Sequence, residues 1–174
     1  TVDLAPDVRL LPGTILEGRT TVASGAVIGP DTRLVDATVG EGAEIQSSFV
    51  HEAEVGPDVH VGPFAHLRPG TVLARGAKVG SFVETKNADI GEGANIGFNC
   101  EIFSASRVRI GRNALVAAYC YLIGGDHDFS DASRPVLDQA RKSAGISVGE
   151  GAWLGAGAKI LDGVDIGANA VIGA

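Results

Sequence analysis

The 174-residue sequence contains no methionine, and only 5% of its residues are aromatic. A core of large or highly flexible side chains is therefore excluded, and we expect a core of small aliphatic residues. The chain has two cysteines, Cys100 and Cys120, and neither belongs to a CxxC motif. We expect both to be buried small hydrophobic residues in a reducing compartment, the cytoplasm, and not a disulfide framework.

Basic clusters and long apolar runs are also missing. The net charge is −7, and Lys and Arg are scattered along the chain. No apolar run approaches the roughly 20 residues that span a bilayer. We therefore expect neither nucleic acid nor a membrane as a partner. Because the chain begins at Thr1 without a Met and ends inside a repeat, we expect a processed, excised or engineered segment.

What the sequence has instead is 25 glycines and an aliphatic residue at every sixth position over long stretches. This pattern is clearest near the end of the chain, at Val148, Leu154, Ile160, Ile166 and Ile172. A period of six spirals around a helix of about 3.6 residues per turn, but it keeps to one face of a strand. Gly, Asp, Asn and Pro within each unit supply corners. The sequence therefore predicts an all-β solenoid of short strands, because a β-sandwich would need longer alternating runs.

These units resemble the hexapeptide-repeat family, in which an aliphatic residue is often followed by Gly and, four positions on, by a small residue. The resemblance implies a left-handed parallel β-helix with three hexapeptides per coil, about eight coils in all, forming one domain over residues 1–174. The handedness rests on the resemblance, since general topology rules favour the opposite hand. The resemblance also implies a homotrimer with ligands bound between subunits.

Arg68 and Lys86 form the first candidate site. They are 18 residues apart, so on a three-sided coil they lie one above the other. Stacked like charges are unfavourable unless an anion lies between them, which predicts a clamp for a phosphate or carboxylate. In the alternative, both side chains splay into solvent or pair with acids such as Glu84.

Residues up to about 90 resemble the acetyltransferase domain of the bifunctional bacterial enzyme that makes UDP-N-acetylglucosamine. In that family the Arg and the Lys hold the phosphate of glucosamine 1-phosphate, which implies substrate-binding roles for Arg68 and Lys86. The catalytic His and a Tyr of that family fall on Phe98 and Glu101. Because Phe cannot accept a proton, the general base of that enzyme is missing.

The second candidate site is a break in the repeat. Leu122 and Val148 are 26 residues apart where six are expected, so we expect an extruded loop near residues 124–146. Within it, His127 stands between Asp126 and Asp128. An imidazole takes a proton from an attacking hydroxyl or amine, and either aspartate could orient the ring and stabilise the imidazolium. A solvent-exposed loop histidine is the alternative.

Residues from about 95 onward resemble sugar O-acetyltransferases related to the maltose and galactoside acetyltransferases and to those of capsule and lipopolysaccharide. The resemblance rests on His127, Phe129, Pro135 and Trp153, with Leu154 in place of the usual Ile. It implies acetyl-CoA as donor, a sugar or sugar phosphate as acceptor, and Phe129 and Trp153 beside the substrate. For Trp153, packing against the loop is the alternative.

Three further residues are candidates for the donor side of the reaction. The backbone N–H of Gly155 could stabilise an oxyanion. Arg141 and Lys142 could contact a phosphate of coenzyme A, although two solvated charges are the alternative.

No metal is expected at the catalytic centre. The γ-class carbonic anhydrase, another hexapeptide-repeat enzyme, binds zinc through three His, two of them five residues apart. Leu122 and Ala132 occupy those offsets from His127, and His60 and His66 are six residues apart, on different faces.

These observations predict an acetyl-CoA-dependent acyltransferase that acetylates a hydroxyl or amino group of a sugar or sugar phosphate, with His127 as general base. One alternative is a glucosamine-1-phosphate N-acetyltransferase-like domain that has lost its His at Phe98. Another is a non-catalytic or engineered β-helical scaffold. Natural divergence, recombination or a built chimera would each join a front half, 1–90, to a back half, 95–174.

Overall fold

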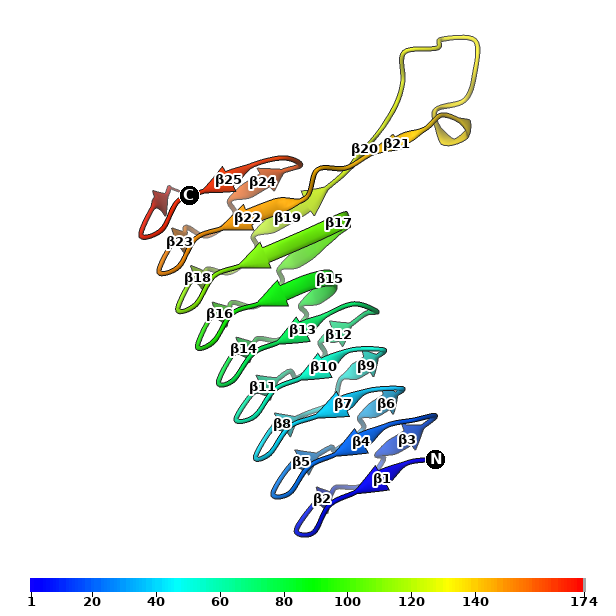
Figure 1. Ribbon diagram of the computed structural model, residues 1–174, viewed down its shortest axis with the longest axis vertical. Helices are drawn as coiled ribbons and strands as arrows, with labels where there is room; N and C mark the ends of the chain where they lie inside the picture. The colour runs from blue at the N-terminus through cyan, green and yellow to red at the C-terminus, as the bar shows by residue number, and fades with distance from the viewer. Residues whose placement is uncertain (174) are drawn as a thin grey trace.

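A computed structural model describes residues 1–173. The chain forms a three-sided prism in which all strand pairs are parallel, and one arm projects from it (Figure 1). This architecture confirms the predicted left-handed parallel β-helix of hexapeptide repeats. The coils are short because a strand of two or three residues is followed by a corner in nearly every repeat.

The strands stack into three faces. Face one consists of β1 (Asp3–Leu4), β4 (Thr21–Val22), β7 (Thr38–Val39), β10 (Glu54–Val55), β13 (Val72–Leu73), the ends of β15 (Glu84–Ile90) and β17 (Glu101–Ile110), β22 (Ile146–Val148) and β25 (Asp165–Ile166). Face two consists of β3 (Ile15–Glu17), β6 (Arg33–Val35), β9 (Phe49–His51), β12 (His66–Leu67), the beginnings of β15 and β17, β19 (Tyr121–Gly124) and β24 (Lys159–Leu161).

Face three consists of β2 (Arg9–Leu10), β5 (Val27–Ile28), β8 (Glu44–Ile45), β11 (His60–Val61), β14 (Lys78–Val79), β16 (Asn95–Ile96), β18 (Leu115–Val116), β23 (Trp153–Leu154) and β26 (Val171–Ile172). The described residues thus complete eight coils and add two strands of a ninth. Strands β15 and β17 continue round the corner from face two to face one, which joins these two faces into one sheet.

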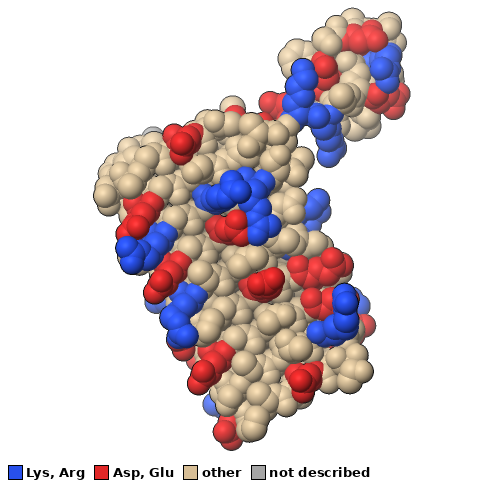
Figure 2. Space-filling model, viewed as in Figure 1, with Lys and Arg blue, Asp and Glu red and all other residues tan. Residues whose placement is uncertain are grey.

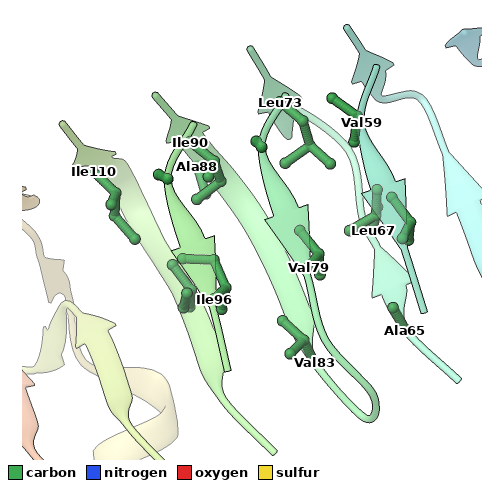
Figure 3. Packing of buried hydrophobic residues seen from close by; sticks show 14 of the residues in the cluster. Val59, Ala65, Leu67, Leu73, Val79, Val83, Ala88, Ile90, Ile96 and Ile110 are labelled. Carbon is green, nitrogen blue, oxygen red and sulfur yellow. The ribbon is translucent and has the colours of Figure 1, made fainter. Parts of the chain in front are cut away.

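The predicted aliphatic positions point into the prism. On face two, one inward column pairs coil to coil and is almost fully buried, at Leu67, Thr85, Ile102, Leu122 and Ile160. Figure 3 shows the same arrangement in the middle coils, where Leu67, Leu73 and Val79 lie in the interior. The hydroxyl of Thr85 is satisfied inside the core by the hydroxyl of Thr71, at 3.0 Å.

The first coil departs from this pattern, because its aliphatic residues have no coil beneath them. Leu4 and Leu10 are 43% and 45% exposed, whereas the equivalent Val22 and Ile28 one coil later are buried. Burial of each repeat thus depends on its two neighbours, as expected for a solenoid.

The arm is the segment between β19 and β22, residues 125–145, close to the predicted bounds of the loop. It contains β20 (Asp126–His127), the short 3₁₀ helix η1 (Val136–Asp138) and β21 (Arg141–Lys142). Strands β20 and β21 form an antiparallel pair that carries the arm away from the body (Figures 1 and 2). The arm leaves and re-enters the prism through glycines with positive φ, Gly125 at 106° and Gly145 at 87°, where side chains are disfavoured.

Candidate functional site

Arg68 and Lys86 lie next to each other on the outer surface of face two. Leu67 pairs with Thr85, and the N–H of Arg68 donates to the carbonyl oxygen of Thr85 at 2.8 Å, so the two cationic residues occupy the same position in successive coils. The stacking that their 18-residue spacing predicts is therefore present. Whether they bind substrate stays a prediction.

Arg68 also has an acidic partner and an aromatic neighbour. Its Nη1 donates to Oε1 of Glu84 at 2.6 Å, and its guanidinium carbon lies 6.0 Å from the ring centroid of Phe103. This pairing with Glu84 is one of the sequence-based alternatives to an anion clamp. Because both side chains are about one third exposed, this ion pair holds Arg68 weakly, and an anion of higher charge can compete for it.

A cavity of about 320 Å³ joins this cationic pair to the arm. Its walls come from face two and from the arm, and include Arg68, Lys86, Phe103, Ile123, His127 and Arg141. Arg68 and His127 are more than two coils apart in sequence, so their spacing does not predict a shared cavity. They line the same cavity because Phe103 and Ile123 continue the outward column of Lys86 towards the arm.

The imidazole of His127 is half-buried at the edge of this cavity. Its Nε2 accepts a hydrogen bond of 2.9 Å from Nε of Arg141, the residue directly opposite in the antiparallel pair. Its Nδ1 is buried and has no hydrogen-bond partner among the described residues. Since an arginine only donates, Nε2 must be the acceptor and the proton of the neutral ring lies on Nδ1.

The two aspartates beside His127 have other contacts. Asp128 accepts a hydrogen bond from the N–H of Ser130 at 2.9 Å and lies 3.6 Å from Nζ of Lys142. The N–H of Ser130 is the main reason that the pKa of Asp128 is lowered. Asp126 is exposed, and it pairs with Lys142 across strands β20 and β21. Neither carboxylate bonds to the ring in the described structure, and their catalytic roles stay predictions.

The remaining candidates lie away from the cavity of this chain. Phe129 is 77% exposed on the arm, and Trp153 is 48% exposed on face three between Leu115 and Val171. The N–H of Gly155 donates to the carbonyl oxygen of Ile172 at 2.8 Å, so that donor is already used by the next coil. Lys142 is exposed beside Asp128. Their predicted roles remain untested by this geometry.

Phe98 lies at an exposed corner between faces three and two. Its ring packs edge-to-face against Tyr119, with centroids 5.4 Å apart. Phe64 and Phe82 stack further along the same corner at 5.1 Å. The corner is therefore aromatic, whereas His127 lies on the arm.

Sequence reasoning missed the residues that attach the arm to the prism. Asp162 accepts hydrogen bonds from the N–H groups of Ala144 and Gly145, at 2.7 and 2.9 Å, and from the hydroxyl of Ser143 at 3.2 Å. The N–H of Ala144 is the first cause of the lowered pKa of Asp162. Asp162 belongs to the turn after β24, one coil beyond the arm, and no local motif connects it with Ser143.

The cysteines are structural. Both are buried, and each thiol donates to a carbonyl oxygen, that of Ala117 at 3.1 Å from Cys100 and that of Gly155 at 3.2 Å from Cys120. Burial raises the pKa of the Cys100 thiol to about 12, so it is not a nucleophile at neutral pH.

Two further observations concern metal-binding clusters and membrane-spanning helices. Within residues 1–173, no His, Cys, Asp and Glu side chains gather in a group of three that could hold a metal ion. Over the same range, no helix has the length and apolar character needed to cross a bilayer.

Two hexapeptide family models match the chain on both sides of the arm. The family described as Bacterial transferase hexapeptide (six repeats) matches residues 145–174. The family described as Hexapeptide repeat of succinyl-transferase matches residues 88–123.

Curated relatives align with nearly the whole chain. The Bifunctional protein GlmU of Paenarthrobacter aurescens is 41% identical over 178 residues, which cover 98% of this chain and 35% of that protein. The protein of the same name from Desulfitobacterium hafniense is 56% identical over 95 residues, 55% of this chain and 21% of that protein. The chain thus spans about 35% of the length of relatives such as the first. That alignment also runs through residues 90–95, so both halves match one relative.

Solved structures resemble the chain more distantly. The polySia specific acetyltransferase NeuO shares 14% identity over all of this chain and 82% of its own, with a TM-score of 0.41. The acetyltransferase domain of PglB from Neisseria gonorrhoeae FA1090 shares 20% identity over 70% of this chain and 48% of its own, with a TM-score of 0.26. Superpositions at these scores support no functional inference.

Proposed function

Because the chain is a hexapeptide-repeat protein, we propose that it is an acetyl-CoA-dependent acyltransferase whose acceptor is a sugar or sugar phosphate and whose general base is His127. One observation carries this proposal. A half-buried imidazole and the stacked cations Arg68 and Lys86 line the same cavity of about 320 Å³. A cavity that offers a proton acceptor at one end and an anion site at the other suits a small phosphorylated acceptor.

The proposed reaction is a direct transfer. The acceptor hydroxyl or amine attacks the thioester carbonyl carbon while Nε2 of His127 takes its proton. The new C–O or C–N bond forms, the C–S bond breaks, and the imidazolium returns the proton to the leaving thiolate. Acetylated acceptor and free coenzyme A leave, and His127 is again neutral.

The anion site supports a charged acceptor. Guanidinium and ammonium groups bind phosphate through charge-assisted hydrogen bonds, and the two side chains here differ by one coil, about 4.8 Å between backbones. Phe103 and Ile123, which lie between the cations and the arm, offer an apolar surface for the less polar face of a sugar ring.

The donor side of the site is best completed by a second copy of the chain. Trp153 lies on face three and His127 on an arm that connects face two to face one, so Trp153 can wall the site of His127 only from a neighbouring copy. A homotrimer would bring such surfaces together. Arg141 and Lys142 are then candidates for contacts with acetyl-CoA, and Phe129 for a contact with the acceptor. Light scattering measures whether three copies associate.

The deciding experiment measures thiol release from acetyl-CoA with a panel of hydroxyl and amino sugars, free and phosphorylated. We expect turnover by the wild type and a loss of at least about 100-fold in His127→Ala, the usual contribution of a general base. His60→Ala is the matched control, because His60 is exposed on face three beside Glu44. Full activity in His127→Ala, or no turnover across the panel, would contradict the proposal.

A second candidate is N-acetylation of glucosamine 1-phosphate without His127. It is favoured by 41% identity to a GlmU protein over 98% of the chain. Specific acetylation of that substrate that survives His127→Ala would identify it. A non-catalytic scaffold is the third candidate, and the absence of coenzyme A binding in calorimetry would support it.

A further inference from the structure

The contact between Arg141 and His127 has a chemical consequence for the proposed base. A neutral imidazole has one lone pair in the ring plane that can accept a proton. In this structure that lone pair belongs to Nε2 and already accepts the hydrogen bond from Nε of Arg141, at 2.9 Å. The other nitrogen, Nδ1, carries the proton and is buried without a hydrogen-bond partner among residues 1–173. His127 in this state cannot accept a proton from a substrate.

The backbone favours this contact. His127 and Arg141 are directly opposed residues of the antiparallel pair β20–β21, and Asp126 and Lys142 are the other opposed residues. Directly opposed side chains in such a pair lie within contact distance. The guanidinium is held by no carboxylate in the described residues, since Asp128 faces Lys142 and Ser130, and Glu84 faces Arg68.

The cavity next to this contact carries an excess of positive charge. Three cationic side chains, Arg68, Lys86 and Arg141, line it, and only Arg68 has an ion-pair partner within residues 1–173. A phosphate monoester carries a charge of about −1.5 to −2 at neutral pH and three strong acceptor oxygens. A guanidinium binds such a group by charge-assisted, often bidentate hydrogen bonds, which are about twice as strong as those to a neutral acceptor.

We propose that Arg141 is a specificity-determining residue that couples anion binding to release of the base. Without an anion, Arg141 occupies Nε2 of His127. A phosphate group held by Arg68 and Lys86 draws the guanidinium onto its own oxygens, and the lone pair of Nε2 becomes free to accept the acceptor's proton. A phosphorylated acceptor is thereby selected over its unphosphorylated form. The inference rests on the proposed role of His127 as base.

The first test does not depend on activity. Diethyl pyrocarbonate carbethoxylates an unprotonated imidazole at a free lone pair, and mass spectrometry of peptides resolves each of the four histidines. At about pH 8 an ordinary imidazole is neutral. We expect Arg141→Ala to raise the rate at His127 by roughly tenfold, as for loss of a hydrogen bond to a charged group, with the rates at the other three unchanged. Inorganic phosphate should raise the rate at His127 in the wild type and not in Arg141→Ala.

The second test uses water as the acceptor. We expect inorganic phosphate to stimulate the slow hydrolysis of acetyl-CoA by the wild type several-fold, whereas Arg141→Ala should hydrolyse faster without phosphate and show no stimulation. Arg134→Ala is the matched control, because Arg134 is an exposed arginine on the same arm that bonds to the carbonyl of Asp138. It should behave like the wild type in both tests.

The outcomes separate the two proposals. Equal carbethoxylation of His127 in the wild type and Arg141→Ala would overturn the role of Arg141, even if acetyl transfer through His127 is found. The carbethoxylation rate at His127 could differ tenfold between the wild type and Arg141→Ala and respond to phosphate, while no variant turns over acetyl-CoA. This result would support the coupling and contradict the proposed acyltransferase. A rise in the rate at all four histidines of Arg141→Ala would indicate unfolding of the prism, because the other three histidines lie on faces two and three. That result would overturn the coupling, unless Arg141→Lys, which retains the charge, raises the rate at His127 alone.

Discussion

The hydroxyl groups of Ser104 and Ser143 lie 2.9 Å apart and share a hydrogen bond, although 39 residues separate them along the chain. Ser104 ends the face-two part of β17, and Ser143 follows β21 at the foot of the arm. The N–H of Ser106 donates to both hydroxyls, at 3.1 and 3.0 Å, and Asp162 accepts from Ser143. The foot of the arm is thus tied to the coil before it and the coil after it.

Replacing Asp162 should loosen the arm without unfolding the prism. Asp162→Ala removes the acceptor for the N–H groups of Ala144 and Gly145. We expect these two amides to exchange with deuterium at least about tenfold faster, which corresponds to one or more lost charge-assisted hydrogen bonds. Exchange in β14 should stay the same. Asp162→Asn, which keeps one acceptor oxygen, should give an intermediate effect, and Asp165→Asn serves as a control on an exposed neighbour.

Acid should release the same contact. The N–H groups of Ala144 and Gly145 hold the pKa of Asp162 below its usual value of 3.8. A carboxylate whose pKa is lower in the folded state contributes stability that is fully present above its unfolded pKa and is lost as the pH falls through the folded pKa. We therefore expect the arm to stay attached above pH 3.8 and to detach below it. Limited digestion of the arm by pepsin measures this. Equal acid sensitivity in Asp162→Ala would contradict it.

The repeat made the prism predictable, since a period of six is a local property of the sequence and each aliphatic residue packs on the same position of the next coil. Val61 and Val79 illustrate this, because they are 18 residues apart and pair in successive coils. The position of the arm was predictable from the missing repeats. Its contacts were not. The pairing of His127 with Arg141 depends on how an irregular loop folds back, and the contact of Ser143 with Asp162 depends on where that loop meets a corner of the next coil.

The candidate site was likewise predictable only where it depends on the repeat. Arg68 and Lys86 could be paired from their spacing, but their connection to His127 could not be predicted. That connection runs through Phe103 and Ile123, whose side chains sit on the outward column and carry no motif. Asp126 and Asp128 are candidates because they neighbour His127 in sequence. In an antiparallel pair, adjacent residues point to opposite faces, so sequence neighbours are poorly placed to contact the ring.

The core beneath the arm should be sensitive to truncation. Leu122 is fully buried between Ile102 and Ile160, just before the arm begins. We expect Leu122→Ala to lower the free energy of unfolding by about 2–5 kcal/mol, the range for a buried leucine. Leu161→Ala is the control, because Leu161 is 63% exposed on the next coil and should change stability by no more than about 0.5 kcal/mol. Urea denaturation followed by circular dichroism measures both, and equal effects would show that this coil is not closely packed.

The last prediction concerns the competition for Arg68. Oε1 of Glu84 lies 2.6 Å from Nη1 of Arg68, and both side chains are about one third exposed. An ion pair of this kind is worth about 0–1 kcal/mol, so its removal should strengthen binding of an anion by up to about fivefold. We therefore expect Glu84→Gln to bind inorganic phosphate more tightly in calorimetry, with a gain that shrinks as salt is added. Glu44→Gln, beside His60 on face three, removes the same charge away from the cavity and is the matched control. An equal gain in both variants would show that net charge alone governs phosphate binding, and no gain in Glu84→Gln would show that Arg68 does not contact the anion.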